Sequence, residues 1–403
     1  MRGSIDIFDP DVYVRGVPHD QFRVLRAEAP VHFHAEPGGP GFWAVTKYHD
    51  IVAISKNPGT FSSARGGTNI KDYPREDLDN IRLMMVNMDP PQHNRFRKLA
   101  STGFTPRMIA RMEEHIRESA AKIIDEVVGL GRCDFVTKIA AELPLQVIAD
   151  VMGVPQDDRH LVFDWSNRLI GFDDPEFQTS HEDALVAAAE MWGYASELAE
   201  KRRAEAPGGK DLVSVLINAE IDGERLDEME FDSFFLLLSV AGNETTRNLI
   251  SGGMLALIEN PQARARLLAD PSLIPSAVEE MLRWVTPVNH FRRTATKDTE
   301  IRGQQIKEGD KVVIYYTSAN RDEEVFTNPD VFDITRSPND HIAFGIGQHS
   351  CLGLSLARLE IRIMFEEILR RMPDVELDGN IRRLRSNFIN GYKEIPVRYT
   401  PGK

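Results

Sequence analysis

Apolar residues recur at the three- and four-residue spacing of α-helices from about residue 88 to residue 290. Short loops with Pro or Gly interrupt this pattern, as at Val154-Pro155. Strand-like segments lie on both sides of the helical region. Residues 31–33 and 42–45 flank a turn-rich stretch of Pro and Gly, and residues 311–316 are β-branched and aromatic. The pattern therefore predicts a mainly α protein with small β-sheets.

No repeat, low-complexity tract or long polar linker interrupts the 403 residues, so we expect a single domain over residues 1–403. The 48 Lys and Arg against 62 Asp and Glu leave a net charge of −14, which argues against binding to nucleic acid or to an anionic membrane. No run approaches 18 apolar residues, and Asp6 and Asp9 lie where a signal peptide would be apolar. We expect a cytoplasmic protein without a membrane anchor.

The chain has only two cysteines, Cys133 and Cys351, which excludes a disulfide framework and cysteine-rich zinc or iron–sulfur sites. Cys351 lies within a segment with three glycines in ten residues (344–353) and precedes an amphipathic helical run. Such a loop lets the backbone approach a flat ligand, and the start of a helix favours a thiolate. A buried structural cysteine is the alternative, but the glycine pattern favours a sulfur ligand.

The spacing of Phe344, Gly347, Cys351 and Gly353 resembles the signature of the cytochrome P-450 superfamily of haem-thiolate monooxygenases. The resemblance implies the cytochrome P-450 fold, a triangular helical body with haem b between a long central helix and the helix after the cysteine. It also implies that Cys351 is the axial ligand of the haem iron and that His349 hydrogen-bonds a haem propionate.

Glu244 and Thr245 lie inside the helical run from about residue 231 to residue 257, beside Gly242. Read alone, a Gly, an acid and two threonines indicate an irregularity or a bend of the helix. The resemblance implies that this helix crosses the haem, with a local widening that makes room for O2 and water. Glu244 and Thr245 would then be the acid–alcohol pair that delivers protons. The family often has Asp at the position of Glu244.

Glu280 and Arg283 are three residues apart in a helical run over 276–284. An isolated pair at this spacing is usually a solvated ion pair of little energetic value. The resemblance matches them to the Glu-x-x-Arg pair of the family, which is buried and has a structural role in the core around the haem-binding loop.

His93 and Arg97 share one face of a helix that we expect to start at Asp89-Pro90-Pro91, with Asp89 as its cap. Both side chains could simply face solvent. The resemblance implies that they bind haem propionates, together with Arg293. Arg292 competes with Arg293 for this role, because a shift of one residue would exchange them.

Residues 241–248 and 386–391 are similar to the bacterial branch that hydroxylates steroids, methyl-branched lipids and terpenoids, and similar wording occurs in alkane hydroxylases. By position in the family, a mostly apolar set of residues could line the substrate pocket, with Asn289 as a polar handle. Some of them could instead be plain core. The set consists of Met84, Met85, Val240, Ala241, Val288, Asn289, Phe291 and Ile389. The segment from Ile70 to Met85 is a plausible lid.

The chain has no flavin-binding signature, so electrons must come from outside, and the resemblance implies a ferredoxin with its ferredoxin reductase. Lys98, Arg358 and Arg362 are candidates for the docking patch, unless they form an ordinary solvated face. The predicted reaction inserts one atom of O2 into a C–H bond of a hydrophobic substrate, in a monomeric enzyme. The alternatives are a linear alkane or fatty-acid hydroxylase, a peroxide-driven peroxygenase, which Glu244 and Thr245 argue against, and a non-enzymatic haem sensor.

Overall fold

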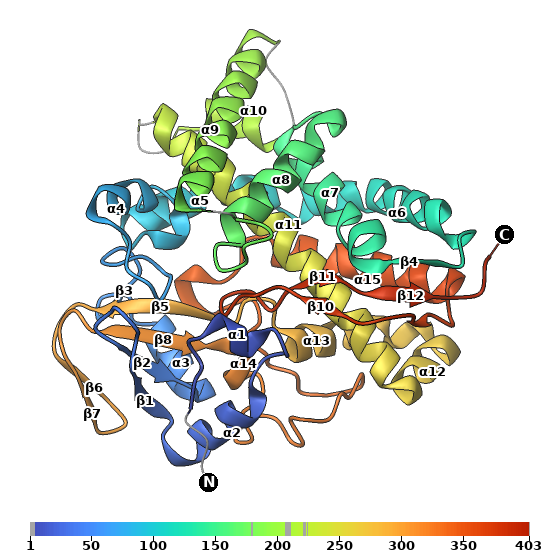
Figure 1. The fold of residues 1–403 in the computed structure, drawn as a ribbon. Coiled ribbons are helices and arrows are strands. Elements are labelled where there is room, and N and C mark those ends of the chain that lie inside the picture. Colours follow the sequence, from blue (N-terminus) through green and yellow to red (C-terminus); the bar gives the residue numbers. More distant parts are fainter. Residues whose placement is uncertain (1–4, 179, 206–210, 221–222, 224, 403) are drawn as a thin grey trace.

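The computed structural model describes residues 5–178, 180–205, 211–220, 223 and 225–402, which are mainly helical, as predicted (Figure 1). The long helix α11 (Glu228–Glu259) runs through the centre of the molecule and packs against α7, α8, α9, α13 and α15. It begins at Asp227, which forms a capping box with Glu230. None of the helices in the described part of the chain is both long enough and apolar enough to cross a bilayer.

The other helices have the following bounds, with the short turns of 3-10 or π type labelled η. The α-helices are α1 (Pro10–Tyr13), α2 (His19–Glu28), α3 (Tyr48–Ser55), α4 (Arg75–Ile81), α5 (Gln92–Ser101), α6 (Pro106–Val128), α7 (Glu142–Met152), α8 (Arg159–Ile170), α9 (His181–Ala204), α10 (Leu212–Asn218), α12 (Pro261–Ala269), α13 (Ile274–Val285), α14 (Tyr316–Ala319) and α15 (Leu354–Arg371). The short turns are η1 (Met85–Asn87), η2 (Thr102–Phe104), η3 (Val136–Ala140), η4 (Gln156–Asp158), η5 (Pro271–Leu273) and η6 (Gly347–His349).

Five strands form the largest sheet, in the order β1-β2-β8-β5-β3. Their bounds are β1 (Val31–His34), β2 (Phe42–Val45), β3 (Phe61–Ser62), β5 (His290–Ala295) and β8 (Lys311–Tyr315), so the three predicted strands are confirmed. Only β2 and β8 pair in parallel within this sheet. The smaller sheets are β4-β12-β9, β10-β11 and β6-β7, from β4 (Arg132–Asp134), β6 (Thr299–Ile301), β7 (Gln304–Ile306), β9 (Glu376–Leu377), β10 (Arg382–Arg383), β11 (Tyr392–Glu394) and β12 (Pro396–Arg398).

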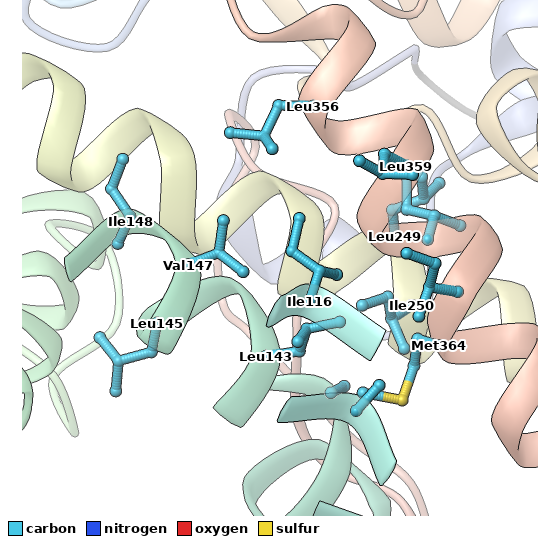
Figure 2. Close-up of a cluster of buried hydrophobic side chains, with 14 of the residues drawn as sticks. Ile116, Leu143, Leu145, Val147, Ile148, Leu249, Ile250, Leu356, Leu359 and Met364 are labelled. Atoms are coloured by element: carbon cyan, nitrogen blue, oxygen red, sulfur yellow. The ribbon is translucent and has the colours of Figure 1, made fainter. Parts of the chain in front are cut away.

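The main hydrophobic core lies where α6, α7, α11 and α15 meet (Figure 2). Leu249 and Ile250 of α11 contribute to it, as do Ile116, Leu143 and Met364 from the surrounding helices. All five side chains are almost fully removed from water, which is the main stabilising term for such a body of helices. This core packs α11 against α15, the helix that follows the Cys351 segment.

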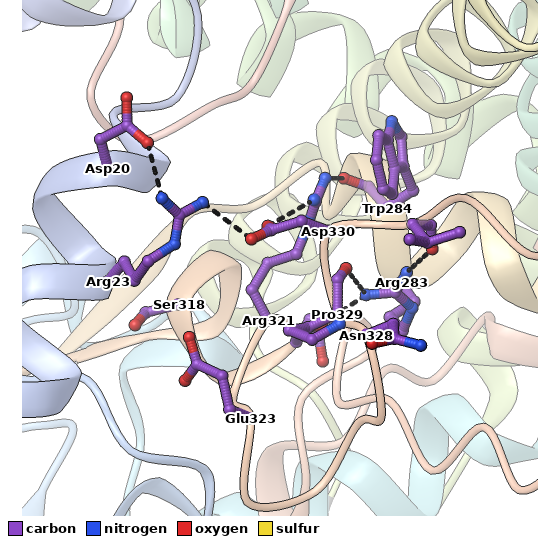
Figure 3. A network of polar contacts seen from close by, with 12 residues as sticks. Asp20, Arg23, Arg283, Trp284, Ser318, Arg321, Glu323, Asn328, Pro329 and Asp330 are labelled. Atoms are coloured by element: carbon purple, nitrogen blue, oxygen red, sulfur yellow. Dashed lines mark hydrogen bonds and ion pairs between the residues drawn. The ribbon is translucent and has the colours of Figure 1, made fainter.

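Glu280 and Arg283 of α13 form a fully buried ion pair, with two nitrogen–oxygen distances of 2.7 and 2.8 Å. Arg283 also donates to the backbone carbonyls of Asn320 and Pro329, both at 2.9 Å (Figure 3). Glu280 accepts from the backbone N–H of Asp333 at 2.8 Å. The pair therefore ties α13 to the long segment that leads to the cysteine loop. These contacts support the predicted structural role of the Glu280–Arg283 pair, which stays a prediction.

Candidate active site

The cysteine loop places Cys351 between η6 and the start of α15. Its backbone N–H donates to the carbonyl of Phe344 at 2.8 Å, which closes the loop. Gly347 has φ +76°, and a Cβ there would lie 2.6 Å from the carbonyl oxygen of Ser55, so only glycine fits. Close packing against the end of α3 therefore requires glycine at position 347 of this loop.

The thiol of Cys351 lines a cavity that α11 borders. Burial raises the pKa of this thiol, while the backbone N–H of Gly353 and the nearby Arg97 and Arg358 act in the opposite direction. A thiolate in such surroundings needs a cationic partner. A metal at the centre of a flat cofactor supplies that charge, so the site fits a haem iron.

Thr245 of α11 lines the same cavity as Cys351. The wall between them is mostly apolar and includes several of the predicted substrate-lining residues. Of the predicted residues, the cavity brings together Cys351, His349, His93, Arg97, Thr245, Ala241, Met85, Val288 and Phe291. Val86, Ile148 and Leu237 also line it, and the sequence analysis missed them because nothing local distinguishes them from core residues.

Four predicted lining residues, Met84, Val240, Asn289 and Ile389, are not among the residues that line this cavity, so their role in substrate binding stays a prediction. Asn289 is fully buried, and its side-chain N–H donates to the backbone carbonyl of Asn387 at 3.0 Å, while its Oδ1 has no partner within the described chain. Ile389 is held by an isolated β-bridge to Val288 and is also buried. Val240 and Met84 pack against the main core instead.

A cluster of basic side chains lies beside Cys351. The rings of His93 and His349 have centroids 4.2 Å apart, and Arg97 donates to the hydroxyl of Ser350 at 3.4 Å. Burial, and after it the charge of Arg293, lowers the pKa of His349 to about 2. The pKa of His93 is also lowered, chiefly by burial. The charges of Arg97 and Arg293 add to the lowering of both pKa values, so the positive charge of the cluster lies on these arginines, and anionic groups would offset it.

The donor set fits the two carboxylates of a haem. His93 carries a buried Nε2 atom with no hydrogen-bond partner within the described chain. Asp89, the acid nearest the cluster, is already bound by the backbone N–H of Ser63 at 2.8 Å and by the hydroxyl of Ser62. Buried hydrogen-bond donors without a partner, beside the charges of Arg97 and Arg293, are well suited to binding carboxylates.

Arg292 and Arg293 are adjacent on β5, so their side chains point to opposite faces of the sheet. Arg292 forms an ion pair with Asp72 at 2.6 Å. The Arg293 side chain donates to the backbone carbonyl of Arg292 at 2.8 Å, and burial lowers the pKa of Arg293. Because Arg292 has its own acid and Arg293 acts on His349 electrostatically, the geometry favours Arg293 as the propionate residue.

The helix that carries His93 and Arg97 starts later than predicted. α5 begins at Gln92 with Pro91 as its N-cap residue, and Asp89 does not cap it because its carboxylate binds Ser62 and Ser63. The one-turn spacing still places His93 and Arg97 on a common face, which lines the cavity.

Glu244 and Thr245 face different surroundings. The hydroxyl of Thr245 donates to the backbone carbonyl of Ala241 at 2.9 Å. Glu244 is fully buried, does not line the cavity and pairs with Arg247, which donates in turn to the side chain of Asn167 at 3.0 Å. Burial raises the pKa of Glu244, and Arg247 opposes this shift.

The predicted local widening of the central helix is not observed. Residues 239–248 stay α-helical, and the side chains of Thr245 and Asn248 bond to carbonyls one turn earlier. Arg247 and Asn167 are site residues that the sequence analysis missed. A charged Arg inside an apolar helical run was the signal that could have identified Arg247.

The predicted docking residues are partly neutralised. Arg358 pairs with Glu279 at 2.6 and 2.8 Å and lies 4.7 Å over the ring of Phe344. Arg362 pairs with Glu113 at 2.9 Å. Lys98, in the last turn of α5, is exposed. In the predicted docking surface, Arg358 and Arg362 are therefore engaged in ion pairs, and Lys98 is exposed.

A model of the protein family described as Cytochrome P450 matches residues 10–378. The chain is 45% identical over 406 residues to the Steroid C26-monooxygenase of Rhodococcus jostii (strain RHA1), covering 98% of this chain and 85% of that protein. It is 44% identical over 409 residues to the Methyl-branched lipid omega-hydroxylase of Mycobacterium tuberculosis (strain ATCC 25618 / H37Rv), covering 99% of this chain and 94% of that protein.

Two solved structures have the same fold. A Mycobacterium marinum cytochrome P450 in complex with pseudoionone has a TM-score of 0.91 and 39% identity, with 98% of this chain and 99% of that chain covered. A Bacillus megaterium cytochrome P450 in complex with testosterone has a TM-score of 0.83 and 33% identity, with 95% and 99% covered.

Proposed function

Because the chain belongs to the cytochrome P450 family and is a monooxygenase with a cysteine-ligated haem, we propose that it hydroxylates a steroid, a methyl-branched lipid or a terpenoid at a C–H bond. It acts on a hydrophobic substrate and takes electrons from redox partners. The observation that carries the proposal is the apolar cavity with Cys351 and Thr245 in its wall. The names of the relatives supply the substrate classes.

The residues that hold the haem are proposed to be Cys351, as axial ligand, and the basic cluster of His93, Arg97, Arg293 and His349, as partners of the propionates. The cofactor is proposed to be haem b. The other cysteine, Cys133, lies on β4 and does not line the cavity, so it is not placed to bond to a haem held there. When bound, the thiolate-ligated haem supplies the oxidising power for the insertion of oxygen.

Proton delivery is assigned to Thr245 and Glu244. The Thr245 hydroxyl lies on the cavity wall and can exchange its bond to the carbonyl of Ala241 for one to a group in the cavity. Glu244 takes up a proton more readily than an exposed carboxylate, because burial raises its pKa. Separation from Arg247 then frees the carboxyl of Glu244 to pass a proton towards Thr245.

Substrate placement is assigned to the apolar wall. Met85, Ala241, Val288 and Phe291 offer surface to a hydrophobic molecule, exclude water from the reacting C–H bond and present no charge to it. A bulky and rigid molecule would be oriented by shape against these side chains, which suits a steroid or a branched chain.

The electron donor is proposed to be a ferredoxin with its reductase. Only two cysteines occur, so the chain cannot hold an iron–sulfur cluster of its own. Docking is proposed at the surface formed by Lys98, Arg358 and Arg362 near the Cys351 loop. Both cysteines are free, which supports a reducing compartment such as the cytoplasm. We further propose that residues 1–403 form a single domain and that the protein is a monomer.

The proposal is tested by turnover under 18O2 with a ferredoxin, its reductase and a steroid, a methyl-branched fatty acid, a monoterpenoid or a linear fatty acid. We expect a product with one 18O atom from one of the first three. Product from the linear fatty acid alone would contradict the substrate assignment. Efficient turnover with hydrogen peroxide and no donor would contradict the electron route, and electron consumption without any oxidised product would contradict the reaction itself.

A further inference from the structure

A second cavity, of about 240 Å³, lies where the C-terminal end of α11 meets α13, the residues before α2 and the β10-β11 hairpin. It shares none of its lining residues with the cavity at Cys351, as far as the described chain shows. We call it the arginine cavity. Its walls include His19, Glu259, Trp284, Arg321, Arg383 and Tyr392.

Arg321 is buried in this wall and held flat against an aromatic ring. Its guanidinium carbon lies 3.6 Å from the ring centroid of Trp284, and one nitrogen donates to Asp330 at 3.2 Å (Figure 3). The side chain is only 6% exposed, and its Nε–H has no hydrogen-bond partner in the described chain. A buried donor of this kind costs free energy unless something accepts from it.

Arg383 repeats the arrangement on the hairpin side of the cavity. Its guanidinium carbon lies 4.5 Å from the ring centroid of Tyr392, and Nη1 donates to the side-chain oxygen of Asn390 at 3.2 Å. Stacking on a ring and one hydrogen bond fix the plane of the guanidinium while leaving further N–H groups for a ligand. Both arginines line the same cavity, and guanidinium groups are the side chains best suited to binding an oxyanion.

The charged side chains that act on His19 are also positive. Burial, and after it the charge of Arg321, Arg383 and two further arginines, holds the pKa of His19 well below its ordinary value. Nδ1 of His19 is buried, and no described residue is its hydrogen-bond partner. Glu259 is the acid in the wall, and burial raises its pKa against the charge of Arg383. Asp330 offsets the charge of Arg321, whereas Arg383 makes no ion pair within the described chain, so its charge is the part of the positive charge that remains in the cavity.

We propose that the arginine cavity binds a phosphate group, with Arg321 and Arg383 as the residues that hold its oxygens. Two guanidiniums and a histidine offer more donors than a carboxylate accepts in one plane, which favours a tetrahedral oxyanion. The cavity is larger than a bare phosphate ion, and Trp284 and Tyr392 provide aromatic surface for an organic part. The phosphate is therefore either the free ion or the ester of a small apolar alcohol or phenol.

The test is isothermal titration of the haem-loaded protein with inorganic phosphate and with phenyl phosphate, at constant ionic strength in chloride. We expect saturable binding, with phenyl phosphate the tighter probe for an ester site and inorganic phosphate for a free-ion site. Arg383→Gln should weaken binding by about tenfold or more. The matched control is Arg382→Gln, because Arg382 is the neighbouring residue, exposed and paired with Glu176.

A second variant keeps the test independent of the stability of Arg383→Gln. Glu259→Gln removes the acid from the wall, so it should tighten phosphate binding. The proposal is overturned if neither probe gives saturable heat, if both arginine variants weaken binding equally, or if Glu259→Gln weakens it. The first result would mean that the protein binds no phosphate, and the other two would place the bound phosphate outside the arginine cavity.

Discussion

Glu244 and Thr245 are neighbours in the sequence, yet only Thr245 lines the cavity. The sequence alone identified Glu244 and Thr245 as candidates, as it did Cys351, His93 and Arg97. It did not predict the surroundings of Glu244, because Glu244 pairs with Arg247, which in turn binds the distant Asn167. The same limit explains Asn289, whose amide is bound by a carbonyl 98 residues further along the chain. Side-chain orientation depends on such tertiary contacts, which local pattern does not contain.

Replacement of Thr245 tests its role in proton delivery. Thr245→Ala keeps the apolar wall, so haem content and substrate binding should persist. The fraction of consumed electrons that appears in product should fall by about tenfold or more, and hydrogen peroxide should rise, because the hydroxyl that delivers protons is gone. Product, NADH and peroxide measured together give this fraction. Thr245→Ser, which retains the hydroxyl, is the matched control; undiminished coupling in Thr245→Ala would refute the assignment.

The buried pair of Glu280 and Arg283 makes a prediction about stability. Arg283→Lys removes the two-pronged bond to Glu280 and the bonds to backbone carbonyls, so that Arg336, at 3.1 Å, is left as the arginine partner of the buried carboxylate. The free energy of unfolding should fall by about 3–5 kcal/mol, with loss of bound haem. Denaturant unfolding measures it. Arg23→Lys, in an exposed pair with Asp20, should change it by less than about 1 kcal/mol. Equal effects of the two variants would contradict the structural role.

At the scale of elements, the connection between α8 and α9 is held by opposite charges. Residues 171–178 carry Asp173, Asp174 and Glu176, and we call this segment the acidic strap. Lys71 pairs with Asp173 at 2.8 Å, and Lys393 pairs with Asp174 at 2.9 Å and with Glu176 at 2.8 Å. The strap therefore links the segment predicted as a lid, from Ile70 to Met85, to the β10-β11 hairpin.

Aromatic contacts join the acidic strap to the substrate cavity. The ring centroid of Phe172 lies 6.3 Å from that of Phe388, which lies 5.6 Å from that of Phe291 in the cavity wall. Release of the strap should therefore loosen one side of the cavity.

Lys393→Gln tests the strap. It removes the cation from the buried carboxylate of Asp174, so we expect substrate to dissociate about three- to tenfold faster, with association also accelerated. Stopped-flow absorption of the haem during substrate binding measures both rates. Lys307→Gln, in an exposed pair with Asp298, provides the control. Rates that match the control would show that the strap does not limit exchange.

Over the whole molecule, the sequence predicted the class of fold, the positions of β1, β2 and β8, and the helical runs that form α11, α13 and α15. Periodicity sufficed because the core is built from amphipathic helices packed around α11. The helix bounds were less well predicted: α5 starts at Gln92, since Asp89 binds two serines before it. The acids that neutralise Arg358 and Arg362 also escaped prediction, because Glu279 and Glu113 are distant in sequence.

Charge on the surface near Cys351 should govern association with the electron donor. Lys98→Glu and Arg362→Glu should each slow reduction of the haem by ferredoxin, by about tenfold at low salt and less at high salt, because they reverse a charge that faces the partner. Stopped-flow reduction measures the rate. Arg398→Glu, in the separate sheet of β4, β12 and β9, should leave it unchanged. Reduction rates that do not respond to either substitution would place the donor elsewhere.

The most direct test of the account is an optical titration of the ferric protein with a steroid, a methyl-branched fatty acid, a monoterpenoid and a linear fatty acid. The account predicts a saturable conversion of the Soret band from low to high spin with one of the first three. That result would show a bulky hydrophobic molecule entering the cavity beside Cys351. No spectral change with any of the four, or a change with the linear chain alone, would contradict it.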